Sequence, residues 1–120
     1  MINKICRFDQ FVEIARQLGF QRVFFAEAIE RLPEYLQGYG TGLYLQLRAD
    51  GSLYVGETID MERRQARHRE LGVRLTALAV MPFQEMTEKE RLEFETELIR
   101  KVKTFGYRMA NKQKLGKEEK

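Results

Sequence analysis

The sequence is poor in the residues that build disulfides and metal clusters. Its 120 residues contain one cysteine, one histidine, two prolines and no tryptophan. A single Cys6 cannot form an internal disulfide, and no histidine or second cysteine stands near it at metal-ligand spacing. These absences make the cytosol the expected compartment. We expect Cys6 to pack as a small apolar residue.

Long apolar runs are also absent. No segment approaches the roughly 20 apolar residues that span a bilayer, and the N-terminal stretch MINKICRFDQ lacks the apolar core of a signal peptide. We therefore expect no membrane association. A hydrophobic content of 43% with 32% charged residues is typical of one ordinary globular domain. The net charge of +3 permits a nucleic-acid partner but does not require one.

The first 40 residues are predicted to form a helical extension. Apolar residues recur at helical spacing from Phe11 to Leu18, and Gly19 ends the run. A second helical pattern runs over 25–32, and Pro33 is expected to end it. We interpret the pair as a helical hairpin that serves packing.

The period of the sequence changes to two from residue 42, which predicts two antiparallel strands joined by a tight turn. A two-residue turn at Asp50-Gly51 would mix apolar and polar side chains on both faces. A three-residue turn over 49–51, with Gly51 left-handed, instead pairs Arg48 with Ser52. The aliphatic residues of both strands then share one face: Leu43, Leu45, Leu47, Leu53 and Val55.

The other face of this predicted hairpin carries Tyr44 and Tyr54, and Gly56 is expected to leave room beside them. Paired tyrosines on a sheet are most often simply good strand formers. A helix should follow, capped by Thr58 or Asp60 and ending near residue 72.

This next helix is rich in arginine and contains the histidine. Arg64 and His68 are four residues apart and should lie on one face. Arg64 is either one of several solvated arginines or a clamp for phosphate charge. His68 is either a satisfied structural histidine or a proton-transfer group. The remaining arginines are candidates for contacts with nucleic acid: Arg63, Arg67, Arg69 and Arg74.

The last third of the sequence predicts a buried third strand over 73–83 and a long helix. Thr87 and Glu90 form a capping box at the start of this helix, and Gly106 closes it. Its expected apolar stripe consists of Leu92, Leu98, Ile99, Val102 and Phe105.

Glu95 interrupts this apolar stripe. Burying an unpaired carboxylate is costly, so such a glutamate usually has a cation or a hydrogen-bond network beside it. The ordinary interpretation is a salt bridge to an arginine of the preceding helix. The functional one is a ligand for Mg²⁺, which is often held by one or two carboxylates and several waters.

The order of these motifs resembles that of the GIY-YIG nuclease superfamily. Gly42-Leu43-Tyr44 and Tyr54-Val55-Gly56 resemble its two naming triplets, each with one aliphatic replacement, and nine residues separate them. Residues 56–64 with His68 resemble the family's glycine, threonine, arginine and histidine. Residues 95–99 resemble its glutamate followed by an aliphatic pair, and 106–111 its closing motif with asparagine. The match covers roughly 41–111, and its combined order is more specific than any single triplet.

The resemblance implies an α+β fold with a small three-stranded antiparallel sheet flanked by helices, and one divalent metal, Mg²⁺ or Mn²⁺. Residues 1–40 would be the N-terminal helical extension, 41–111 the nuclease domain and 112–120 a polar tail. Glu95 would hold the metal, and Arg64 would stabilise charge developing on the phosphate. The resemblance implies supporting roles for four more residues: Tyr44 would position or activate the attacking water, Tyr54 and His68 would assist it, and Asn111 would brace the site.

The leading hypothesis from the sequence is a metal-dependent endonuclease that acts on DNA, with RNA as a possible substrate. One alternative is a catalytically idle module of the same fold that binds nucleic acid through its arginines. Another is a protein-interaction module that recruits a partner through the N-terminal helices. The sequence carries no indication of the oligomeric state, the target or the pathway.

Overall fold

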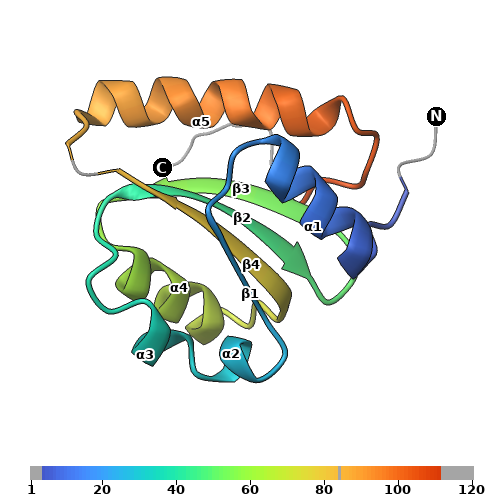
Figure 1. The fold of residues 1–120 in the computed structure, drawn as a ribbon, viewed down its shortest axis with the longest axis horizontal. Helices are drawn as coiled ribbons and strands as arrows, with labels where there is room; N and C mark the ends of the chain where they lie inside the picture. The colour runs from blue at the N-terminus through green and yellow to red at the C-terminus, as the bar shows by residue number, and fades with distance from the viewer. Residues whose placement is uncertain (1–3, 84, 112–120) are drawn as a thin grey trace.

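The computed structural model of the chain describes residues 4–83 and 85–111. They form an α+β fold in which a four-stranded antiparallel sheet lies between two groups of helices (Figure 1). The elements, in chain order, are α1 (Phe8–Gln17), β1 (Arg22–Phe25), α2 (Glu27–Glu30), α3 (Leu32–Tyr35), β2 (Gly42–Arg48), β3 (Leu53–Thr58), α4 (Met61–Glu70), β4 (Leu75–Pro82) and α5 (Glu88–Lys103). The predicted polar tail, 112–120, lies outside the described residues.

The hairpin of β2 and β3 has the predicted register. Leu47 lies opposite Leu53, and the Arg48 amide donates to the carbonyl of Ser52 over 2.9 Å. Gly51 has a φ of +85°, the left-handed conformation that a three-residue turn with a bulge requires. This register was predictable because any one-residue slip would move the aliphatic side chains of the strand to the wrong face.

The prediction of three strands is wrong, because residues 22–25 form a fourth strand, β1, immediately before and overlapping the start of the helix predicted over 25–32. The sheet has the order β1-β4-β2-β3, with Arg22 opposite Val80 and Phe25 opposite Ala77. The segment from Val23 to Phe25 contains β-branched and aromatic residues that suit a strand as well as a helix. Pairing with β4, distant in the sequence, decides between the two.

The predicted N-terminal helical hairpin is therefore wrong as well. Only α1 matches its expected first helix. After β1 the chain makes two helices of four residues each, α2 and α3. Pro33 does not end a helix but lies in the first turn of α3, where its missing amide hydrogen costs nothing. The division into an extension over 1–40 and a nuclease domain over 41–111 stays a prediction.

Two hydrophobic cores lie on the two faces of the sheet. One face packs against α1 and α5, and the other against α2, α3 and α4 (Figure 1). All five aliphatic residues of the hairpin belong to the first core, as predicted, and Tyr44 belongs to the second. Cys6 is buried in the first core, as expected, and burial followed by the nearby Asp9 raises the pKa of its thiol to about 11.

The two longer helices after the hairpin begin where the sequence predicts. Asp60 caps α4 by accepting from the Arg63 amide, and Thr58 in turn accepts from the Asp60 amide. Thr87 and Glu90 make the predicted capping box of α5. Leu98 and Val102 are buried, but Leu92 is 43% exposed, so the predicted apolar stripe of α5 does not extend over its first turns. No helix among the described residues has the length and apolar character needed to cross a bilayer.

Candidate active site

Tyr44 and His68 form the centre of the candidate site. Tyr44 lies in the middle of β2 and is fully buried, and its hydroxyl is 2.9 Å from Nε2 of His68 on α4. Gly56 lies opposite Tyr44 on β3, and a Cβ there would overlap the phenol ring and hydroxyl. Gly56 thus leaves the room predicted from the sequence, and the space is filled by Tyr44.

Tyr54 completes an aromatic cluster around this hydrogen bond. Its ring stacks on Tyr44 with centroids 6.2 Å apart and an interplanar angle of 29°. It also meets His68 edge-on, with centroids 5.3 Å apart. Such offset and edge-to-face contacts favour a fixed mutual orientation. The two tyrosines and the histidine are therefore brought together by two strands and one helix.

The cluster is uncharged at neutral pH. Burial, followed by the charges of Arg48 and Arg64, lowers the pKa of His68 to about 4. Burial, followed by the neighbouring Tyr54, raises the pKa of Tyr44 above its ordinary range. The hydrogen bond therefore joins a neutral phenol and a neutral imidazole, and the tautomer of His68 decides which of the two donates.

Arg64 lies against the same cluster from α4. Its Nη1 donates to the main-chain carbonyl of Glu57 over 3.2 Å, across to β3. Burial alone would lower the pKa of Arg64, but the adjacent Tyr44 and Glu57 raise it, so the guanidinium keeps its charge. This half-buried position distinguishes Arg64 from the solvated arginines around it.

Glu95 faces the tyrosines from α5. Burial is the largest cause of the raised pKa of Tyr54, and the negative charge of Glu95 is the second. The charge of Glu95 also raises the pKa of Tyr44. The side chain is half-buried, in agreement with a glutamate placed within an otherwise apolar stripe. The fold thus brings Glu95 to the tyrosine pair although it lies 41 residues after Tyr54 in the chain.

A divalent cation is compatible with this donor set only in a water-rich form. Among residues 4–83 and 85–111, no three His, Cys, Asp or Glu side chains come together as a ready-made cage. A single carboxylate that leaves most positions to water suits Mg²⁺ or Mn²⁺ and does not suit a structural zinc site. Glu95 is the carboxylate that would hold the ion.

An ion pair that the sequence did not predict lies next to Glu95. Arg91, one turn earlier on α5, donates to the Glu57 carboxylate over 2.7 Å, and the two side chains are 12% and 18% exposed. Glu57 therefore connects α5 through its carboxylate and α4 through its carbonyl. In the sequence, the only indication was that Arg91 lies one helical turn before Glu95 and so should face the same neighbours as Glu95.

Asn111 joins the C-terminal segment to β3. Its side-chain oxygen accepts from the Val55 amide over 2.9 Å, and its side-chain nitrogen donates to the Val55 carbonyl over 2.8 Å. The side-chain amide thereby makes the two main-chain hydrogen bonds that a neighbouring strand would otherwise make with Val55. Val55 lies between Tyr54 and Gly56, so Asn111 holds the part of β3 that carries both residues.

A buried polar chain below the tyrosines was also missed. Arg48 donates through Nε to Gln46 over 2.9 Å, and Gln46 donates to Gln65 on α4 over 2.9 Å. Both glutamines are buried. The signal was present in the alternation of β2, which puts Gln46 and Arg48 on the same face as Tyr44.

The arginines expected to bind nucleic acid do not join the cluster. All four are exposed: Arg63, Arg67, Arg69 and Arg74. Arg67 forms a surface ion pair with Glu70. Exposure leaves all of them accessible to a charged partner, but it gives no indication of which of them would contact one.

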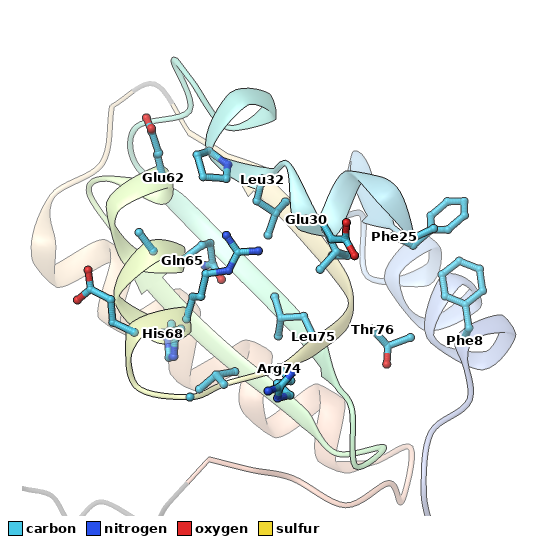
Figure 2. A pocket seen from close by; sticks show the side chains of 18 residues that line it. Phe8, Phe25, Glu30, Leu32, Glu62, Gln65, His68, Arg74, Leu75 and Thr76 are labelled. Carbon is cyan, nitrogen blue, oxygen red and sulfur yellow. The ribbon is translucent and has the colours of Figure 1, made fainter.

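A groove of about 940 Å³ is a separate feature of this face. It lies between α4, the α2–α3 segment and the start of β4, with Phe8 and Phe25 at one end (Figure 2). Of the predicted site residues, only His68, Arg69 and Arg74 line it. This groove therefore lies beside the two tyrosines and shares only His68 with the aromatic cluster.

Compared with models of known families, with curated proteins and with solved structures, the chain finds no significant match.

Proposed function

We propose that this protein is a divalent-metal-dependent endonuclease of the GIY-YIG type, which hydrolyses phosphodiester bonds in DNA. One observation carries the proposal: the Tyr44 hydroxyl is hydrogen-bonded to Nε2 of a neutral His68, with Arg64 and Glu95 facing the same pair of rings. A structural core has no need for a cation, a carboxylate and a proton-accepting imidazole around one buried hydroxyl. RNA remains a possible substrate.

The side chains have distinct tasks in this mechanism. The Tyr44 oxygen would accept a hydrogen bond from the attacking water, and the mechanism requires the tautomer of His68 that accepts the proton of Tyr44. As the water oxygen bonds to phosphorus, its proton would pass to Tyr44 and the tyrosine proton to His68, so the phenol need not ionise beforehand. The bond from phosphorus to the leaving sugar oxygen would break in the same step, and that oxygen would take a proton from solvent. This order agrees with the raised pKa of Tyr44.

Charge on the phosphate is opposed from two sides. Arg64, always protonated and half-buried, would bind a non-bridging oxygen as negative charge develops there. A divalent cation held by Glu95 would polarise the phosphate as a Lewis acid. Tyr54 keeps the Tyr44 ring in place, and Asn111 keeps the β3 segment in place.

A plasmid-nicking assay with Mg²⁺ or with chelator tests the proposal. We expect nicking only with the metal, and a loss of about 100-fold or more in Glu95→Gln. Glu93→Gln, an exposed glutamate on the same helix, is the matched control and should cleave normally. Equal activity of all proteins in both conditions would refute the assignment of metal and carboxylate.

The arginine is tested in the same assay. Arg64→Ala should abolish nicking, because its half-buried charge faces the cluster, whereas Arg67→Ala should mainly weaken binding. Equal losses of nicking activity in the two variants would mean that Arg64 acts like the solvated arginines around it.

The groove supports a second candidate, a catalytically idle module that binds nucleic acid or another protein. Its lining mixes apolar with charged side chains, and an exposed aromatic ring, Phe25, lies at one end (Figure 2). Salt-sensitive retention of DNA without cleavage in Mg²⁺ or Mn²⁺ would favour this candidate over the nuclease.

A further inference from the structure

Arg48, at the end of β2, is held in an unusually defined position for an arginine. Its guanidinium carbon lies 4.4 Å from the centre of the Tyr54 ring. Its Nε donates to Gln46, which is itself fixed by the buried Gln65. The planar group is thus stacked on one side and anchored at one nitrogen, so the directions of Nη1 and Nη2 are set.

The positive charge of Arg48 is partly buried, and Asp50 is a carboxylate whose negative charge acts on it. Asp50, two residues away, is engaged by Ser52 and Arg108. Burial lowers the pKa of Arg48, which reflects a cation partly removed from water. Such a charge costs free energy unless an anion approaches it.

The position of Arg48 relative to Arg64 suggests what that anion is. Arg48 contacts Tyr54 and Arg64 contacts Glu57, so the two cations meet β3 three residues apart, roughly 10 Å along the strand. A single nucleic-acid strand, with one phosphate for about every 3.4 Å of helix axis, places several phosphates over such a distance. A small anion would need only one of the two arginines.

We propose that Arg48 binds a second phosphate of the substrate strand, a few nucleotides at most from the one that is cleaved, as a second anchor beside Arg64. The inference rests on the proposed nuclease function and defines the substrate as a polynucleotide strand that extends past the tyrosine cluster toward the end of β2. The two Nη atoms of Arg48 are the paired donors that a phosphate would accept.

Binding of a fluorescein-labelled DNA oligonucleotide, measured by anisotropy in chelator across a series of salt concentrations, tests the proposal without cleavage. We expect Arg48→Gln to weaken binding about fivefold and to reduce the slope of log K against log salt by about 1. Arg48→Lys should keep the slope, because the charge remains. Arg16→Gln is the matched control, since Arg16 is exposed on α1, across the sheet, and pairs with Glu13.

The outcomes separate the two proposals. If the wild type binds and nicks DNA while Arg48→Gln has the affinity and slope of Arg16→Gln, the inference is refuted and the nuclease stands. If the wild type shows no salt-dependent binding and no nicking, both are refuted. Circular dichroism checks that each variant is folded. If Arg48→Gln unfolds, Arg48→Met replaces it, because methionine keeps an apolar side chain over Tyr54. An unchanged salt slope in Arg48→Met would also refute the inference.

Discussion

At the outer strand of the sheet, Gly56 lies opposite Tyr44 and leaves no room for a side chain. A methyl group at this position must push the Tyr44 ring away from His68. We expect Gly56→Ala to destabilise the protein by about 2 kcal/mol, because Tyr44 is fully buried and cannot move freely. Urea unfolding measures this loss.

Gly40→Ala is the control for Gly56→Ala. A Cβ at Gly40 would meet only the carbonyl oxygen of Ile59, at 3.6 Å, which is an ordinary contact. Its effect should stay below about 1 kcal/mol. Similar stability of the two variants would show that Tyr44 does not need the space at Gly56.

His68 can be observed selectively by NMR, because it is the only histidine in the chain. The groups that face it are Tyr44 and Tyr54 with their rings, and Arg48 and Arg64 with their charges. An NMR titration of the imidazole should give a pKa of about 4 in the wild type. Arg48→Gln should raise this pKa, since it removes a nearby positive charge. An unchanged pKa in that variant would place the Arg48 charge away from His68.

The same shift makes stability depend on pH. Because the pKa of His68 is lower in the folded protein than its ordinary value of about 6.5, the unfolded chain binds more protons between pH 6.5 and 4. Stability should therefore fall as the pH falls through this range. The difference in unfolding free energy between wild type and His68→Gln isolates this effect from the titration of carboxyl groups.

At the scale of elements, the connection between β3 and α5 depends on the ion pair of Glu57 and Arg91. Both side chains are mostly buried, so removing one partner leaves the other as an uncompensated charge. We expect Arg91→Ala to destabilise the protein by about 2–3 kcal/mol. A double-mutant cycle with Glu57→Gln measures the coupling.

Arg100→Ala on the same helix is the comparison for Arg91→Ala. Arg100 also pairs with a glutamate, Glu97, but both are largely exposed, and such pairs contribute about 0.5 kcal/mol. If both variants lost the same stability, the pair at Glu57 would be no more than a surface contact.

The elements also show which features the sequence could predict. The turn at Gly51 and both helix caps depend on residues close together in the chain, and they were predicted correctly. β1 was missed because its strand partner, β4, lies more than 50 residues away. Motif order named residues that the fold brings together, Tyr44, Tyr54 and His68, and their role in a site stays a prediction. The contacts of Arg48 and Arg91 depend on tertiary packing that no local pattern encodes.

At the scale of the whole molecule, α1 contributes buried side chains to the first hydrophobic core. Phe11 is fully buried between α1 and the sheet. We expect Phe11→Ala to cost about 3–5 kcal/mol in thermal or urea unfolding. Val12 is 37% exposed, and Val12→Ala should cost less than about 1 kcal/mol. Comparable small losses would mean that α1 is only loosely attached.

The pairing of Asn111 with Val55 also has a consequence for the order of events during synthesis. β2, β3 and α4 are all synthesised before α5 and residue 111. The tyrosines, Arg64 and His68 therefore precede Glu95 and the residue that holds Val55. Since domains generally fold as units, a nascent chain without α5 would lack the carboxylate proposed to hold the metal, and the proposed activity would require α5.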